Sequence, residues 1–236
     1  MTVGLAIMAC QLASAEVQDK AKSIGGVVVH YELILPNGYD PAKAYPAVLA
    51  FPGGPQTMSM VKSTVQYNWR DQAERRGYIV VVPSAPDGDL FFEEGARVFP
   101  ELITQLLADF KVDGGKFQIA GWSNGGLSAF HIAATYPQYF LSVTAFPGDL
   151  LYPTAERVQA LAGLCINMYA GELDADWLDA MKQQSEQFRA KGYKVRFTVE
   201  AGQAHRLETL AGDGAARLFD QFEQARRGCR ATQADR

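Results

Sequence analysis

The chain has 236 residues, of which 48% are hydrophobic and 20% charged, a balance typical of a globular protein with a substantial core. Its 22 basic and 26 acidic residues give a net charge of −4 and are spread along the sequence, which argues against a nucleic-acid partner. No stretch approaches the roughly 20 apolar residues of a membrane-spanning helix, so a membrane-embedded transporter is excluded. The three cysteines and three histidines lack the spacing of metal ligands, and we expect no metal site.

The amino terminus has the features of an export signal. Residues 3–13 are nearly all apolar, and Ala13-Ser14-Ala15 is a small-x-small cleavage pattern. We therefore expect residues 1–15 to be a signal segment and the mature chain to start near Glu16, in a secreted or periplasmic protein. A lipoprotein anchor on Cys10 is the less favoured alternative because Met8 fits that pattern poorly, and an ordinary apolar terminus is the other.

The rest of the chain alternates between strand and helix patterns. The segment Val27–Leu35 is rich in β-branched and aromatic residues and ends at Pro36-Asn37-Gly38, which predicts a strand and a turn. Short apolar runs then alternate with amphipathic segments, and this alternation predicts one α/β domain over residues 16–236, with a mostly parallel sheet covered by helices on both faces. The runs read as strands are 47–51, 78–82, 117–120, 142–146, 165–170 and 195–199, and the segments read as helices are 58–76, 98–110, 125–136, 177–191 and 215–226.

A G-x-S-x-G sequence lies between a strand pattern and a helix pattern. Gly121-Trp122-Ser123-Asn124-Gly125 follows the run 117–120 and precedes a helical segment. This context is typical of a nucleophile elbow, in which glycines allow a tight turn and a strained serine exposes its hydroxyl. The alternative is an ordinary strand-to-helix turn. We expect Ser123 to be a nucleophile.

A serine nucleophile needs a base, and the chain offers three histidines. His30 lies inside the first predicted strand. His131 lies about two helical turns past Ser123 and should point away from its hydroxyl. His205 follows the last predicted strand, in a loop before the last helix, and is therefore the expected base.

The third member of such a triad is a carboxylate that follows a later strand and orients the histidine. Asp174 is the favoured candidate, because the turn at Gly171 leaves about three residues for the chain to swing back toward His205. Asp176 is the second candidate and could equally cap the next helix. Asp149, after the preceding strand, is the third.

Acyl transfer also requires two N–H donors for the oxyanion. One is expected from Asn124, the residue after the serine, and one from the loop that follows the strand 47–51. Pro52 and Pro55 have no N–H to donate. Gly54 is the favoured donor in this loop, with Gly53 and Gln56 as alternatives.

With these pieces the sequence resembles the α/β-hydrolase superfamily, and within it the polyhydroxybutyrate depolymerases, feruloyl esterases and carbohydrate acetylesterases. The matching segments extend over about residues 27–225 and include the Gly53-Gly54 loop, the Ser123 elbow, Tyr136-Pro137 and the loops of Asp174 and His205. These families usually carry a histidine where this chain has Pro52.

The resemblance implies hydrolysis of carboxylic esters by a serine mechanism without a cofactor. Two alternatives come from other classes: a serine peptidase of the prolyl-oligopeptidase type, which usually carries an additional gating domain, and a non-catalytic binding protein on a hydrolase scaffold. We expect no large lid, because residues 147–162 join two strands and must contain a helix.

An open cleft suits small-molecule esters or esters linked to a polysaccharide or polyester. Four aromatic residues are candidates to line it, and packing in the core is an equally strong interpretation for each. They are Phe91, Phe92, Trp122 and Trp177.

Two cysteines remain if Cys10 leaves with a signal segment. Cys165 opens a strand that runs toward Asp174, and Cys229 follows a helix that starts near His205 and runs back. Both should therefore reach the sheet edge opposite the active site, and we expect them to form a disulfide. The alternative is a buried thiol and a free one.

Overall fold

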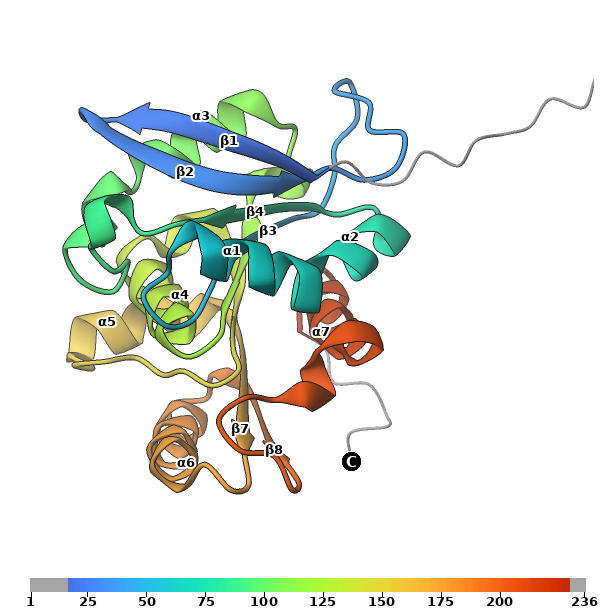
Figure 1. Ribbon diagram of the computed structural model, residues 1–236. Coiled ribbons are helices and arrows are strands. Elements are labelled where there is room, and N and C mark those ends of the chain that lie inside the picture. Colours follow the sequence, from blue (N-terminus) through green and yellow to red (C-terminus); the bar gives the residue numbers. More distant parts are fainter. Residues whose placement is uncertain (1–16, 230–236) are drawn as a thin grey trace, which may run out of the picture.

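The structure, a computed structural model, describes residues 17–229 (Figure 1). The expected signal segment at residues 1–15, including Cys10, lies outside the described residues. The strands are Val17–Ile24 (β1), Val27–Ile34 (β2), Ala47–Phe51 (β3), Ile79–Pro83 (β4), Phe117–Gly121 (β5), Phe140–Ala145 (β6), Cys165–Gly171 (β7) and Lys194–Glu200 (β8).

Helices connect the strands and cover the sheet. The α-helices are Met58–Thr64 (α1), Arg70–Arg76 (α2), Glu101–Asp109 (α3), Asn124–Thr135 (α4), Ala155–Ala160 (α5), Ala175–Ala190 (α6) and Ala216–Arg226 (α7). A π-helical turn, Val65–Trp69 (η1), joins α1 to α2. Short 3-10 turns lie at Pro86–Gly88 (η2), Glu94–Val98 (η3), Asp113–Gly115 (η4), Pro137–Tyr139 (η5), Leu161–Gly163 (η6), Glu208–Leu210 (η7) and Gly212–Ala215 (η8). Within residues 17–229, no helix has the length and apolar character needed to cross a membrane.

All eight strands form one sheet in the order β1-β2-β4-β3-β5-β6-β7-β8. The six strands from β3 to β8 are parallel, and β1 and β2 join them as an antiparallel hairpin at one edge. The carboxyl ends of β3, β5, β7 and β8 therefore meet at one edge of the sheet. This edge brings the loops of the predicted site together.

The two faces of the sheet bury separate apolar layers, because successive side chains of a strand point to opposite faces. In β3, Leu49 and Phe51 pack in the layer formed with α3, α4, α5 and α6. Val48 and Ala50 pack in the layer formed with α1, η1, α2 and α7. The prediction of a mostly parallel sheet covered on both faces is confirmed.

Three elements differ from the sequence-based expectation. Strand β1 is not predicted, because only Ile24 of its eight residues is buried and its apolar pattern is weak. The helix expected at 98–110 begins at Glu101, since Pro100 holds Phe99 in an extended conformation. The segment 58–76 is helical throughout but contains the π-helical turn. Between β6 and β7 the chain forms α5 and η6, so the expected helix in this connection is present.

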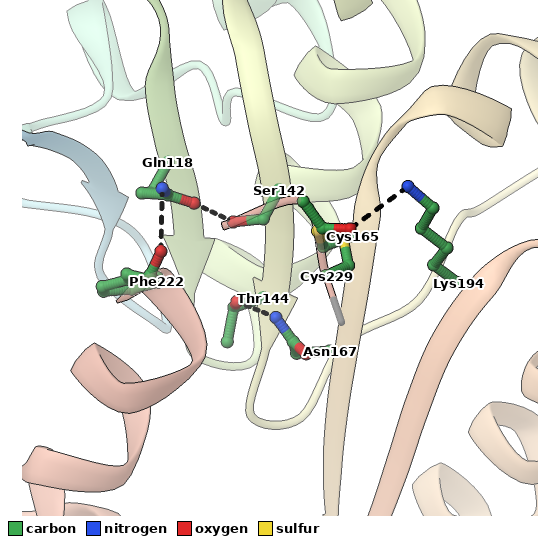
Figure 2. The surroundings of a disulfide bond; sticks show 9 residues. Gln118, Ser142, Thr144, Cys165, Asn167, Lys194, Phe222 and Cys229 are labelled. Carbon is green, nitrogen blue, oxygen red and sulfur yellow. Dashed lines mark hydrogen bonds between the residues drawn. A yellow bond between two sulfur atoms is a disulfide. The ribbon is translucent and has the colours of Figure 1, made fainter. Parts of the chain in front are cut away.

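The disulfide lies at the amino-terminal end of β7, the sheet edge opposite the site, and Figure 2 shows its surroundings. Cys165 opens β7 and Cys229 follows α7; their Cα atoms are 5.8 Å apart across the bond, which spans 64 positions of sequence. The pairing agrees with the prediction. Close to it, the Gln118 side chain donates a hydrogen bond to the carbonyl of Phe222 at 3.3 Å, which fixes α7 against β5.

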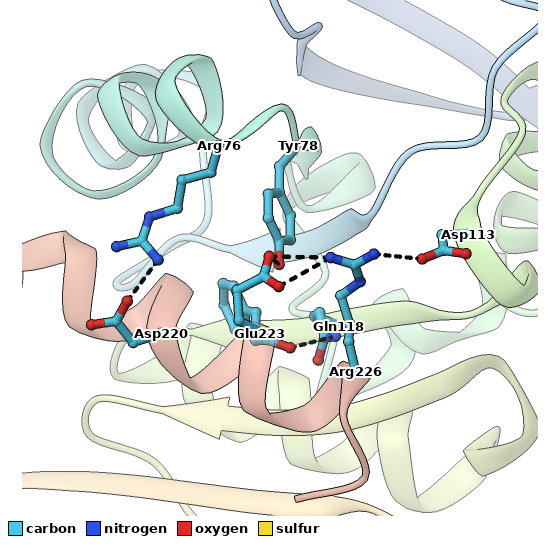
Figure 3. Close-up of polar contacts among 8 residues, drawn as sticks. Arg76, Tyr78, Asp113, Gln118, Asp220, Glu223 and Arg226 are labelled. Atoms are coloured by element: carbon cyan, nitrogen blue, oxygen red, sulfur yellow. Dashed lines mark hydrogen bonds and ion pairs between the residues drawn. The ribbon is translucent and has the colours of Figure 1, made fainter. Parts of the chain in front are cut away.

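Polar contacts also hold α7 in place (Figure 3). The Tyr78 hydroxyl donates to Glu223 Oε1 at 2.5 Å, and burial together with this bond raises the pKa of Tyr78. Arg226 donates to Glu223 at 3.1 Å and to Asp113 at 2.7 Å. The turns η7 and η8 separate α7 from His205, so these contacts fix the element in which the segment after His205 ends.

Candidate active site

The elbow after β5 has the geometry that the G-x-S-x-G pattern predicts. Ser123 has φ 56° and ψ −122°, a backbone conformation that costs free energy for a residue with a side chain. Its N–H donates to the carbonyl of Pro147 at 2.9 Å, and the N–H of Gly125 donates to the carbonyl of Trp122 at 2.8 Å. These bonds hold the strained serine at the start of α4.

Glycine is required on both sides of the serine. A Cβ at Gly121 would overlap the carbonyl oxygen of Gly125, and a Cβ at Gly125 would overlap the carbonyl oxygen of Phe51. A Cβ at Gly126 would in turn overlap the carbonyl oxygen of Pro147. The turn therefore brings four backbone segments closer together than any larger residue permits.

Ser123, His205 and Asp174 form a chain of hydrogen bonds. His205 Nε2 lies 2.8 Å from Ser123 Oγ, and His205 Nδ1 lies 2.7 Å from Asp174 Oδ2. When the Nδ1 proton is donated to the carboxylate, Nε2 is free to accept the proton of the serine hydroxyl. The structure thus brings together the three side chains singled out from the sequence.

Backbone contacts fix the acid loop against the histidine loop. The N–H of Leu173 donates to the carbonyl of Gln203 at 2.8 Å, and the N–H of Gly202 donates to Glu172 Oε2 at 2.7 Å. A Cβ at Gly171 would overlap the carbonyl oxygen of Ala204. The Gly171 turn therefore sets the distance between the two loops.

The other two carboxylates do not contact His205. Asp176 lies exposed in the first turn of α6, where its charge favours the helix N-terminus. Asp149 follows β6, and burial raises the pKa of its carboxyl group. Neither is the hydrogen-bond partner of the imidazole.

The remaining histidines lie away from the serine. His131 Nδ1 is 3.0 Å from a guanidinium nitrogen of Arg157, and burial together with this cation lowers the pKa of His131 to about 4. His131 is therefore a neutral partner of a half-buried arginine. His30 is exposed on β2.

The loop after β3 leaves two of its predicted oxyanion donors available. The N–H of Gln56 is already bonded to the carbonyl of Gly53 at 3.3 Å, so Gln56 is not a free donor. Gly54 has φ 57°, and its N–H meets no acceptor among residues 17–229. Asn124 is the first residue of α4, so its N–H has no acceptor within the helix. Gly54 and Asn124 therefore remain the favoured pair, with Gly53 as the alternative to Gly54.

Two side chains that support this loop are not predicted from the sequence. The Asn124 amide donates to the carbonyl of Gly54 at 2.9 Å and thus links the two sides of the oxyanion site. Gln56 is fully buried, donates to Ser128 Oγ at 2.8 Å and accepts from the N–H of Phe91 at 3.1 Å. The sequence indicates this role of Gln56 only by placing a glutamine in a loop rich in glycine and proline.

The four aromatic candidates fall into different environments. Phe91 is wrong as a cleft residue: it is fully buried and packs against Phe51 and Phe99 in the core. Phe92 is half-buried. Trp122 and Trp177 flank the imidazole of His205, with ring centroids 6.0 and 5.6 Å away.

Fold and site together define a class. A mostly parallel sheet with helices on both faces and a nucleophile-elbow turn after a central strand is the α/β-hydrolase fold. The chain belongs to the esterase family described as "Putative esterase", whose model matches residues 96–231, more than half of the sequence. This family membership agrees with the resemblance to esterases seen in the sequence.

Solved structures share this fold over almost the whole chain. Esterase 2 of Thermogutta terrifontis, phosphorylated by paraoxon, matches with a TM-score of 0.68 and 17% identity over 97% of this chain and 100% of that one. A ferulic acid esterase matches with a TM-score of 0.69 and 18% identity over 91% of this chain and 98% of that one. At such identities the likeness shows the fold alone.

A curated relative comes from a different enzyme class. Dipeptidyl-peptidase 5 of Porphyromonas gingivalis is 27% identical over 143 residues, which are 53% of this chain and 21% of that protein. The chain therefore spans only about a fifth of this relative's length.

Proposed function

We propose that this protein hydrolyses carboxylic esters through an acyl-enzyme intermediate on Ser123. The observation that carries the proposal is the chain of hydrogen bonds from Ser123 Oγ through His205 to Asp174, at 2.8 and 2.7 Å. A serine hydroxyl is a weak nucleophile at neutral pH, and this arrangement supplies the base that it needs. The strained backbone at Ser123 supports the same conclusion, since such strain clusters at functional sites.

In the first step Ser123 Oγ bonds to the acyl carbon while its proton moves to His205 Nε2. The tetrahedral intermediate collapses, the bond to the alcohol oxygen breaks, and His205 gives the proton to the departing alcohol. Water then attacks the acyl-enzyme, passes one proton to His205 and releases the carboxylic acid as Ser123 recovers its proton. Asp174 stays ionised and stabilises the imidazolium.

The negative oxygen of each intermediate would lie between the N–H groups of Gly54 and Asn124. Hydrogen bonds from fixed backbone donors are worth most where charge develops in the transition state. The Asn124 side chain supports this role because it ties the two donors together through the Gly54 carbonyl. The substrates of this site are small-molecule esters or esters borne on a polymer.

Ser123→Ala tests the nucleophile. We expect it to abolish hydrolysis of 4-nitrophenyl acetate and labelling by a fluorophosphonate probe, measured as the mass increase of the intact protein. Ser23→Ala, on the exposed surface of β1, is the matched control and should retain both. Labelling of Ser123→Ala at the wild-type rate would refute the assignment.

A peptidase activity is the second candidate, favoured by the similarity to dipeptidyl-peptidase 5. The same serine, histidine and carboxylate would cleave an amide, with the amine in place of the alcohol as leaving group. Matched ester and anilide substrates with the same acyl group separate the two. Faster hydrolysis of the anilide than of the ester would favour the peptidase.

We also infer that the protein is exported and that its disulfide forms in an oxidising compartment. The small-x-small pattern at Ala13-Ser14-Ala15 and the pairing of Cys165 with Cys229 support this. Intact-mass measurement of protein from the medium or periplasm should show a chain that starts near Glu16 and is two hydrogens lighter than its reduced form. Retention of the full-length reduced chain in the cytosol would contradict it.

A further inference from the structure

A cavity of about 90 Å³ opens beside the histidine loop and is not part of the hydrogen-bonded chain at Ser123. Its walls come from four segments that are distant in the sequence. Tyr67 belongs to the π-helical turn, Trp122 and Phe146 follow β5 and β6, and Arg206 and Leu207 follow His205. The cavity therefore lies at the same edge of the sheet as the reactive serine.

The helical wall of the cavity has a regular pattern. Met60, Ser63, Thr64, Tyr67 and Asn68 are spaced by three and four residues, so they share one face of the continuous helix formed by α1 and η1. The opposite face carries the residues that pack in the apolar layer against the sheet. One face of this helix thus packs in the core, and another lines the cavity.

The position of the cavity relative to the imidazole indicates which part of an ester it receives. Trp122 lines the cavity and lies beside the imidazole of His205, with ring centroids 6.0 Å apart, and its indole N–H donates to the His205 carbonyl at 3.4 Å. Trp177, on the other side of the imidazole, does not line the cavity. Because His205 must protonate the leaving oxygen, the alcohol is the part of the ester closest to the loop that forms this wall.

We propose that this cavity binds the leaving alcohol and that it selects small hydroxylated alcohols. The inference rests on the proposed esterase function and names the substrate class of that site. The volume of about 90 Å³ is smaller than the ~150 Å³ of a cavity that holds a benzene ring, so a small alcohol fits it better than an aryl group.

The outer rim limits the size of the alcohol. The Arg206 guanidinium lies over the Tyr67 ring, 4.4 Å from its centroid, and the side chain of Arg206 is also paired with Glu208 at 2.9 Å. Tyr67 is 47% exposed, so its ring forms the boundary between the cavity and solvent. Stacking of an arginine on an aromatic ring holds both side chains in place.

The inner wall provides polar groups for a second hydroxyl. Thr64 Oγ donates to Asn68 Oδ1 at 3.1 Å, and Asn68 Nδ2 donates to the carbonyl of Leu210 at 2.9 Å. A primary amide has two donor hydrogens, so one hydrogen of Asn68 remains, and the Thr64 oxygen can still accept. Phe146 and Leu207 supply the apolar remainder.

The test uses acetate esters that differ only in the alcohol: methyl, 2-hydroxyethyl, propyl and benzyl acetate. We expect wild-type kcat/KM to be higher for the 2-hydroxyethyl ester than for the isosteric propyl ester by about 5-fold, the effect of one hydrogen bond. Thr64→Val should remove this preference. Tyr67→Ala should raise the benzyl-to-propyl ratio about 5-fold or more by opening the rim, and Ala211→Leu should lower the propyl-to-methyl ratio by filling the cavity.

A second series with methanol as the alcohol and acetyl, propionyl or butyryl groups serves as the internal reference. We expect Tyr67→Ala and Ala211→Leu to leave these acyl ratios unchanged. Tyr152→Ala, an exposed tyrosine that does not line the cavity, is the matched control and should shift neither series. Tyr67→Ala enlarges the cavity and Ala211→Leu fills it, so each variant tests the size of the cavity independently. If one of them does not fold, the other still tests the inference.

The outcomes separate the inference from the proposed function. If the variants change the acyl ratios and not the alcohol ratios, the cavity binds the acyl group and the inference is wrong. If all esters are hydrolysed with unchanged ratios, the inference fails while the esterase function stands. If the wild type hydrolyses no ester and Ser123→Ala behaves identically, both are overturned.

Discussion

Gln56 should determine how well the oxyanion loop is held, and Gln56→Ala tests this. The side chain is fully buried, donates to the carbonyl of Pro52 and to Ser128 Oγ, and accepts from the N–H of Phe91. It has φ 51°, and alanine also carries a Cβ, so the substitution does not relieve the backbone strain. The effect of the substitution is therefore loss of the anchor alone.

The magnitude follows from the groups left behind. The N–H of Phe91, a fully buried residue, would lose its acceptor, which costs about 1 to 3 kcal/mol. Loss of the two donated bonds and of packing brings the expected decrease in unfolding free energy to about 2 to 4 kcal/mol. At ~2 to 4 °C per kcal/mol for a domain of this size, Tm should fall by about 4 to 16 °C.

The loop carries Gly54, so activity should fall as well. We expect kcat for 4-nitrophenyl acetate to drop about 10- to 100-fold in Gln56→Ala. This decrease is at most equal to the one that complete loss of one oxyanion donor causes. The assay compares kcat and the calorimetric Tm with those of Gln72→Ala. Gln72 is also buried, but among residues 17–229 its side chain is hydrogen-bonded to Arg76 of the same helix alone, so its variant should lose less stability and keep wild-type kcat. Equal kcat in the two variants would refute the role of Gln56.

Three further predictions concern the acid, the disulfide and the end of β8. Asp174→Asn should lower kcat by about four orders of magnitude while Asp176→Asn changes it little, measured by ester hydrolysis; the reverse would make Asp176 the acid. Cys229→Ser should lower the unfolding free energy of the oxidised protein by about 4 kcal/mol in the chain-entropy model, and an unchanged thermal midpoint would contradict this. Burial opposes ionisation of Glu200, but hydrogen bonds from Arg217 and Thr209 lower the pKa of its carboxyl group overall. The contribution of the ion pair to the unfolding free energy is therefore present at neutral pH and is lost as pH falls through that pKa. Arg217→Ala should therefore cost about 1 to 2 kcal/mol at pH 7, allowing for the solvent exposure of the arginine, and progressively less as pH falls through the lowered pKa of Glu200, measured by urea denaturation. A difference that does not change with pH would argue against the ion pair.

The parts of the fold that the sequence predicted are those determined by local pattern. The run 117–120 is apolar except for Gln118 because β5 is buried on both faces, and the turn after it is recognised by the G-x-S-x-G spacing. His205 and Asp174 could be assigned because parallel strands end at one edge. By contrast, β1 is an edge strand whose polar residues face solvent. The alternation of apolar and polar residues along it is therefore too weak to predict a strand.

The residues that sequence reasoning missed depend on contacts between distant segments. Phe91 was a candidate for the cleft because its local sequence does not show that Phe51 and Phe99 enclose it. Gln56 reaches Ser128 across 72 positions of sequence. The side chain of Asn124 was also missed, since only the folded elbow shows that its amide faces the Gly54 carbonyl.

The position of the disulfide has a consequence for cleavage of the chain. Residues 165–229 form a covalent ring, and this ring contains both Asp174 and His205, while Ser123 lies outside it. A protease that cuts once within the ring opens it but releases no fragment, because the two pieces stay linked through sulfur. Such a nicked molecule would run as two bands on a reducing gel and as one without reductant, and its acid and base would remain tethered to β7.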